Sequence, residues 1–440
     1  MKKPSKLLQM MFEHERWQDL LDNATEKEID LKVIEELCNP ENRMKLFEII
    51  YQDKYNIFPP HIAKIPKDTP GEFREVYVNE ARDRIVLTLI NDCLCELFAD
   101  MVHPQCKSYQ KGIGTQKVVA QISNEIVRLS KIICYILGYK SDFSKYFDTV
   151  RIEVIDNVFD IIEKRLGFEK GTEPVINLLR RYYHQDLYFD ERGNLCEKYQ
   201  ALKQGCAVAS FLANVCLYEL DEFMSNKYKI YYRYSDDVVV VDKDTTYVID
   251  DMNSIINKYG VKLNPKKVEP LYVDRWFKFL GFNTKRNMIT LSKNRVKKLQ
   301  KELEKRTINK IKKGYKITPE QAAKSIARFL YEGEYSWATS CLGTINVYKD
   351  ILEIDKFIFD CLRACDVWTK EGKKKTKIGG LGSVNSLSDK TILRGKGKHV
   401  KYLREHTDKY FENYYTMCCL SKNLKISKAV FNATVRNMKG

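Results

Sequence analysis

Hydrophobic and polar positions along this chain of 440 residues show two periodicities, one helical and one strand-like. Apolar residues recur at helical spacing through residues 7–21 and 26–38, and Asn39 and Pro40 then supply a stop signal. We therefore expect residues 1–60 to form an N-terminal helical extension.

After residue 60, strand-like alternation appears beside the helical spacing. Residues 73–78 alternate as a strand does, and residues 84–101 return to helical spacing. Residues 139–300 mix short strand-like runs with amphipathic helices, and the chain beyond Thr290 is helical, most regularly over residues 293–313. The pattern predicts an α+β body over residues 61–285, followed by an all-α region over residues 286–440.

Charge separates the same two regions. The whole chain carries a net charge of +16, but Lys and Arg exceed Asp and Glu by 35 − 15 = +20 over residues 281–440, which leaves −4 for residues 1–280. This split fits a part that grips a polyanion and a part that keeps acids for another purpose, such as holding divalent cations. A lysine-rich solvated surface explains the charge equally well.

Composition narrows the class of protein further. The longest apolar run, over residues 132–138, is too short to cross a membrane, and the first residues lack the pattern of a secretion signal. The chain has 13 cysteines without the paired C-x2-C spacing of a zinc site, so we expect reduced thiols in a cytoplasmic protein without structural zinc or membrane contact.

Two acidic segments carry the candidate chemistry. Residues 231–241 (YYRYSDDVVVV) predict a buried hairpin with Asp236 and Asp237 at its tip. Acids are common in turns, but carboxylates at the end of a buried strand need a partner, and a divalent cation is a natural one. Asp142 follows an apolar run, where it either caps a helix or adds the third carboxylate needed to hold two cations ~3.5–4 Å apart.

Two further segments are weak signals by themselves. Residues 204–214 (QGCAVASFLAN) fit a glycine turn that enters a helix, and residues 276–282 (WFKFLGF) fit an aromatic core strand. These two segments become a stronger functional signal because they occur in a defined order and at defined intervals beside the acidic segments.

Taken together, these segments resemble the motifs of a bacterial reverse transcriptase. The first carboxylate motif matches residues 142–148, the Q-G…L-A-N motif matches residues 204–214, and the Y-x-D-D box matches residues 234–237. The lysine motif is similar to residues 263–267 and the primer-grip hairpin to residues 279–282. Upstream, the D-R-I-V element is similar to residues 83–86 and the S-Y…G-x-G-T element to residues 108–115. The resemblance covers roughly residues 60–285. It implies a right-hand polymerase, with fingers and an antiparallel palm sheet, followed by a basic helical thumb.

The resemblance also implies roles for single residues. Asp142, Asp236 and Asp237 would be catalytic and, with Phe143 beside them, would hold two Mg²⁺ ions, whereas Phe147 would exclude a 2′-hydroxyl. Nucleotide contacts would come from Gln204, Gly205, Lys67, Arg74 and Lys267, although Lys266 could fill the place of Lys267. The primer grip would consist of Phe279, Leu280 and Gly281.

Departures from the family pattern help to decide which subgroup of bacterial reverse transcriptases the chain resembles. Ala207 and Ala209 stand where intron-type enzymes usually have Pro and Ser, and residues 354–368 only partly resemble a group II intron maturase thumb. We expect no nuclease segment to follow. The resemblance is then best to the stand-alone unknown-group or defence-associated bacterial enzymes, with a retron, a diversity-generating element or an intron relative as alternatives.

Such enzymes copy a structured non-coding RNA into complementary DNA in phage defence, so the implied partners are that RNA, the DNA product and deoxynucleotides. We expect RNA contacts from Lys297, Lys298, Lys301, Lys305, Lys373, Lys374 and Lys375, and such contacts weaken with salt. A template-independent or non-catalytic ribonucleoprotein is the alternative function. Priming and oligomeric state stay open.

Overall fold

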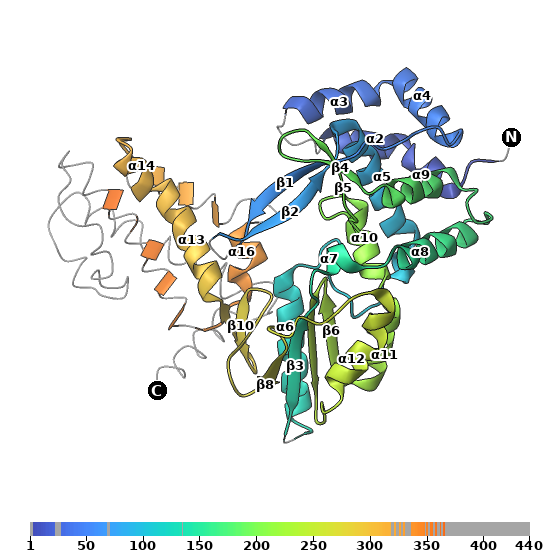
Figure 1. The fold of residues 1–440 in the computed structure, drawn as a ribbon. Helices are drawn as coiled ribbons and strands as arrows, with labels where there is room; N and C mark the ends of the chain where they lie inside the picture. Colours follow the sequence, from blue (N-terminus) through green and yellow to red (C-terminus); the bar gives the residue numbers. More distant parts are fainter. Residues whose placement is uncertain are drawn as a thin grey trace. The chain divides into compact units, whose positions relative to one another are not determined.

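The computed structural model describes residues 3–22, 28–67, 71–133, 135–317 and, with gaps, 321–365. The chain forms two compact units (Figure 1). The first unit comprises residues 1–111 and 138–270, and the second comprises residues 112–137 and 271–440. Among the described residues, no helix combines the length and apolar character needed to span a membrane.

Four helices begin the first unit: α1 (Lys6–Met11), α2 (His14–Asp22), α3 (Glu28–Cys38) and α4 (Pro40–Tyr51). The helical pattern over residues 7–21 is interrupted after Met11, and the Trp17 indole N–H donates to the Met11 carbonyl oxygen across this break, at 2.9 Å. Asn39 ends α3 as expected and also starts α4, because its side chain accepts from the Glu41 N–H.

A four-stranded sheet follows, in the order β2-β1-β4-β5. Strands β1 (His61–Pro66) and β2 (Phe73–Val78) form a long antiparallel hairpin, and the expected strand over residues 73–78 is confirmed. The short strands β4 (Leu187–Phe189) and β5 (Leu195–Glu197) complete the sheet on the β1 side.

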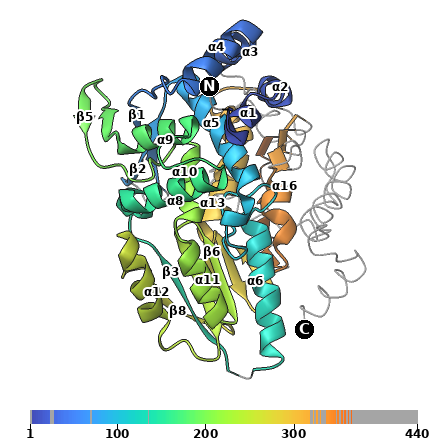
Figure 2. The same cartoon turned by 90° about the vertical axis from the view of Figure 1, so that its right-hand side faces the viewer.

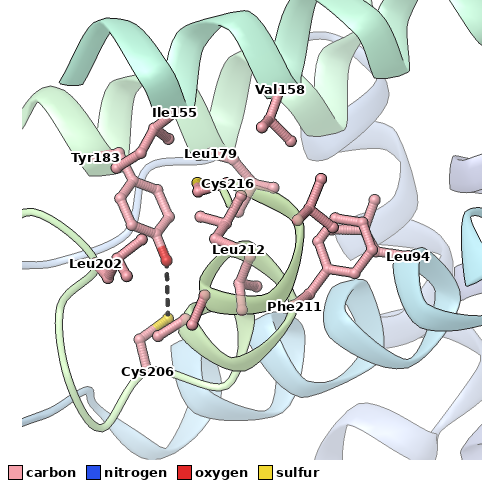
Figure 3. Close-up of a cluster of buried hydrophobic side chains, with 14 of the residues drawn as sticks. Leu94, Ile155, Val158, Leu179, Tyr183, Leu202, Cys206, Phe211, Leu212 and Cys216 are labelled. Carbon is pink, nitrogen blue, oxygen red and sulfur yellow. Dashed lines mark hydrogen bonds between the residues drawn. The ribbon is translucent and has the colours of Figure 1, made fainter. Parts of the chain in front are cut away.

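A helical core supports the loop that contains Gln204 and Gly205. It is built from α5 (Ala81–Leu97), α8 (Ile152–Arg165), α9 (Pro174–His184) and α10 (Val208–Val215). Figure 3 shows side chains of all four helices packed together, and the Tyr183 hydroxyl of α9 donates to Cys206 Sγ just before α10. Packing of this density fixes the position of the loop.

The palm sheet has the strand order β6-β7-β3-β8. Strands β6 (Ile230–Tyr234) and β7 (Asp237–Asp242) form the predicted hairpin, β3 (Leu137–Asp142) lies beside β7, and β8 (Glu269–Tyr272) lies at the sheet edge. Helices α11 (Tyr218–Lys227) and α12 (Val248–Ile256) pack together beside this sheet (Figure 2). The α+β class is therefore confirmed.

The second unit combines α6 (Thr115–Ser130) with an antiparallel sheet of β9 (Phe277–Phe279), β10 (Phe282–Lys285) and β11 (Met288–Leu291). Helices α13 (Lys293–Arg306), α14 (Ile308–Lys312) and α16 (Trp337–Ser340) follow. The single helix expected over residues 293–313 is interrupted at Thr307, whose φ of −126° and ψ of −93° are not helical.

A buried carboxyl group joins α1 to α9 in the first unit. Ser5, the N-cap of α1, donates to Glu173 Oε1 at 2.5 Å, and Glu173 Oε2 accepts from the Ile176 N–H at 2.6 Å as the cap of α9. Burial, with a smaller effect of the Glu163 charge, raises the pKa of Glu173 to about 7.

The unfolding free energy should consequently depend on the ionisation of Glu173. Folding raises the pKa of Glu173 above its ordinary 4.5, so the protonated carboxyl group stabilises the folded state fully below pH 4.5. This stabilisation is lost as the pH rises through about 7. The loss is at most about 3 kcal/mol. Urea unfolding followed by circular dichroism should show a weaker pH dependence for Glu173→Gln than for the wild type.

The exposed neighbour Glu169 offers the matched control. We expect Glu169→Gln to keep the wild-type pH dependence. A Glu173→Gln variant with the wild-type pH dependence would contradict this assignment.

Candidate active site

The palm sheet brings the three predicted catalytic aspartates to one place. Asp142 ends β3, Asp236 lies in the turn after β6, and Asp237 begins β7. The Phe143 N–H donates to the Asp236 carbonyl oxygen at 3.0 Å, which holds the end of β3 against the turn. Asp142 is therefore not a helix cap; the residue before α7 (Tyr146–Thr149) is Lys145.

Burial and mutual repulsion dominate the electrostatics of this cluster. Burial raises the pKa of Asp236, and the Asp142 charge adds to this effect. Burial and the charges of Asp236 and Asp142 raise the pKa of Asp237 to about 7. Carboxylates that disfavour one another's ionised form take up a proton more readily, and a nearby positive charge favours the ionised form instead.

Lys267 supplies one positive charge. Its Nζ donates to Asp142 Oδ2, while the backbone N–H of Lys266 donates to Asn264 Oδ1. Burial alone would lower the pKa of Lys267, but the hydrogen bond and charge of Asp142, with the charges of Asp236 and Asp237, outweigh it and raise the pKa. Of the two lysines that the sequence left open, Lys267 is the one in contact with the cluster.

The residues fit a divalent cation although the side chains do not form a ready cage. No group of three His, Cys, Asp or Glu side chains has the arrangement of a metal site in the described part of the chain. However, Asp142 is only 5% exposed and its Oδ1 has no hydrogen-bond partner among the described residues. An unpartnered buried carboxylate oxygen beside two further carboxylates is a donor set that Mg²⁺ accepts.

The predicted nucleotide loop lies next to Phe147. The Leu202 N–H donates to the Phe147 carbonyl oxygen at 3.0 Å, and the Tyr77 N–H of β2 donates to the Gln204 carbonyl oxygen at 2.7 Å. Gly205 has a φ of +111°, and a Cβ at this position would lie 2.6 Å from the Tyr77 carbonyl oxygen. Only glycine accepts both the backbone conformation and this close approach.

The two predicted basic residues of the β1–β2 hairpin differ in their surroundings. The Arg74 charge acts on the pKa of Asp236, to which it makes a small lowering contribution. Lys67 instead lies 3.6 Å from Glu72, within the hairpin itself. Arg74 is therefore linked electrostatically to the aspartates, and Lys67 has a local ion-pair partner.

The remaining predicted site residues belong to the second unit. Leu280 and Gly281 form the two-residue turn between β9 and β10, with φ values of 47° and 81°, and Phe279 ends β9. The predicted RNA contacts of α13 are exposed: Lys297, Lys298, Lys301 and Lys305. Lys373, Lys374 and Lys375 lie outside the described residues.

Two buried basic residues were not anticipated. Lys203, directly before Gln204, is fully buried and donates from Nζ to the Gln185 carbonyl oxygen at 2.6 Å, and burial lowers its pKa to about 8. Arg233 is fully buried in β6 and pairs with Asp221 of α11 at 2.6 Å. The signal for Arg233 was a single basic residue in the strand-like run 230–234, whereas nothing in the sequence around Lys203 marked that residue as buried.

Comparison with protein families now identifies the class of protein. Residues 65–284, half of the chain, match the family model described as "Reverse transcriptase (RNA-dependent DNA polymerase)". The chain belongs to this family. Its members are RNA-directed DNA polymerases, a class of nucleotidyltransferase, and they generally use divalent metal ions.

A curated relative is the "Putative COX1/OXI3 intron 2 protein" of Saccharomyces cerevisiae, 25% identical over 185 residues. These residues are 42% of this chain, and they span 20% of the yeast protein.

Two solved structures are also similar to the chain. The apo telomerase of Candida tropicalis truncated from its C-terminal domain gives a TM-score of 0.40 at 15% identity, over 57% of this chain and 60% of that chain. The telomerase of Candida albicans in complex with a fragment of telomeric RNA gives a TM-score of 0.42 at 12% identity, over 87% of this chain and 68% of that chain.

The close approach at Gly205 yields a testable prediction. Gly205→Ala should reduce nucleotide incorporation at least tenfold, because the new Cβ displaces the loop from β2. Gly193→Ala is the matched control: Gly193 also has a positive φ, of 83°, but nothing lies within 4 Å of the added Cβ. Primer-extension rates should separate the two variants, and equal losses in both would contradict the role given to the close approach.

Proposed function

We propose that this chain is an RNA-directed DNA polymerase that copies a dedicated, structured non-coding RNA into complementary DNA, and that it serves antiphage defence in the bacterial cytoplasm. The observation that carries the catalytic part is the meeting of Asp142 with Asp236 and Asp237 at the end of β3. The Phe143 N–H bond to the Asp236 carbonyl oxygen joins the two segments, and Asp142 keeps a buried oxygen without a partner among the described residues.

The chain's own residues have distinct tasks in this proposal. Asp142, Asp236 and Asp237, with the backbone of Phe143, would hold two Mg²⁺ ions. When bound, the ions would activate the primer 3′-hydroxyl for attack and neutralise charge on the leaving pyrophosphate. Phe147 would pack against the sugar of the incoming nucleotide and exclude a 2′-hydroxyl.

Positive side chains would orient the triphosphate. Arg74 contributes charge towards Asp236, and Lys267, already beside Asp142, can hold a proton close to the pyrophosphate. Gln204 and Gly205 would contact the nucleotide from a loop fixed to β2. Lys67 would join them only after leaving its ion pair with Glu72.

The basic last third of the chain supports an RNA partner. Residues 281–440 carry a net charge of +20, and the described lysines of α13 are exposed on a helix whose Leu299 and Leu303 are buried. Such a surface gives affinity for a phosphate backbone with little sequence readout. The dedicated template and the defence role rest on the resemblance to stand-alone defence-associated enzymes.

The test is to purify the full chain from cells that carry its native flanking DNA and to sequence all bound RNA and DNA. An Asp236→Ala/Asp237→Ala variant is purified in parallel, and both strains are challenged with phages. We expect one discrete RNA, complementary DNA that is absent from the variant, and protection that is lost with it.

Other outcomes would overturn defined parts of the proposal. Homopolymeric DNA unrelated to the bound RNA would replace templated synthesis by untemplated synthesis. Complementary DNA in the variant would overturn the roles of the aspartates. Equal phage sensitivity with and without the gene would overturn the defence role.

A further inference from the structure

The turn that carries Asp236 and leads into Asp237 is strained. Tyr234 pairs with Asp237 as the last pair of the β6–β7 hairpin, so Ser235 and Asp236 form a two-residue turn. Ser235 has a φ of 59°, in the left-handed region that glycine usually occupies at the first position of such a turn. A side chain in this conformation costs about 1–2 kcal/mol, so surrounding contacts must hold it.

Arg233 holds the turn from inside the protein. Its guanidinium donates to the Ser235 carbonyl oxygen at 3.2 Å and to the Ala213 and Asn214 carbonyl oxygens at 3.0 and 2.8 Å. Asp221 accepts two further hydrogen bonds from it, at 2.7 and 2.6 Å. These five hydrogen bonds of the buried cation are directed at the end of α10, at α11 and at the strained turn.

Tyr109 meets the same turn from the partly exposed side. Its hydroxyl lies 3.1 Å from Ser235 Oγ, within hydrogen-bond distance, and the residue as a whole is 48% exposed. Tyr109 itself has a φ of 54°. The segment before it is fixed to β6, because the Lys107 N–H donates to the Arg233 carbonyl oxygen and the Arg233 N–H donates to the Gln105 carbonyl oxygen.

We propose that Tyr109 and Arg233 are positioning residues that clamp the strained Ser235 turn, so that Asp236 stays against the end of β3 beside Asp142. Tyr109 holds the side chain of Ser235 and Arg233 holds its carbonyl. Neither residue needs to touch the nucleotide. This inference rests on the proposed polymerase function for its kinetic consequence, but the clamp itself is a property of the fold.

The clamp predicts how variants combine. Tyr109→Phe and Ser235→Ala each remove the same hydrogen bond, so each should lower the population of the competent turn and reduce kcat about fivefold. The double variant should lose no more than either single variant, because both act through one contact. The KM for deoxynucleotide should stay at the wild-type value in all three.

A glycine at position 235 separates the clamp from a direct contact. Ser235→Gly relieves the backbone strain, so Tyr109→Phe should have little effect on kcat in that background. Tyr247→Phe is the control and should match the wild type, since Tyr247 is an exposed tyrosine of the same unit at the start of α12, without a hydrogen bond to the turn among the described residues. The half-exposed position of Tyr109 avoids the folding loss expected from changes at buried Arg233.

The experiment measures kcat and KM by primer extension on poly(rA) with oligo(dT), and unfolding free energies in urea, for the full chain and all these variants. Fivefold losses that do not multiply, with an unchanged KM and a coupling between positions 109 and 235 in unfolding, would support the clamp. Losses that multiply, a wild-type kcat for Tyr109→Phe, or a raised KM with unchanged kcat would overturn it.

Failure of the proposed function would give a different result. If the wild type incorporates nothing on this template or on its co-purified RNA, the polymerase proposal fails, and the unfolding measurement still decides the clamp. Additive unfolding free energies for Tyr109→Phe and Ser235→Ala would then overturn the inference by themselves.

Discussion

Asp142, Asp236 and Asp237 repel one another, and the rest of the first unit must hold these three carboxyl groups together. Three carboxyl groups lie at the adjoining ends of two strands, where burial and neighbouring charge raise the pKa values of Asp236 and Asp237. Such a site destabilises the protein by itself, and it persists only because the surrounding structure fixes the strands that carry it.

That fixation has identifiable parts. The apolar strand β7 is anchored in the palm sheet, Arg233 and Asp221 join the hairpin to α10 and α11, and Lys267 donates to Asp142. The helical core of Figure 3 does the same for the loop of Gln204 and Gly205. Rigid packing and buried hydrogen bonds therefore precede the chemistry, as preorganisation of a charged site requires.

The sequence predicts the catalytic aspartates better than it predicts the buried contacts and helix breaks around them. The hairpin tip at Asp236 and Asp237 and the strand end at Asp142 were predictable because apolar strand runs with carboxylates at their ends have a distinctive pattern. Helix breaks after Met11 and at Thr307 were missed because they depend on tertiary contacts and backbone geometry. The buried Lys203 and the Arg233–Asp221 pair were also missed, since periodicity does not show which charged residues find partners inside.

The aspartate cluster fits a divalent cation, and thermal unfolding of the purified full chain, with and without Mg²⁺ at constant ionic strength, tests this fit. The wild type should unfold at a higher temperature with Mg²⁺, because binding to the folded state adds stability. Asp237→Asn should be more stable than the wild type without metal and should lose most of the response. An unfolding temperature of the wild type that does not change with Mg²⁺, together with a destabilised Asp237→Asn, would contradict a cation site at the cluster.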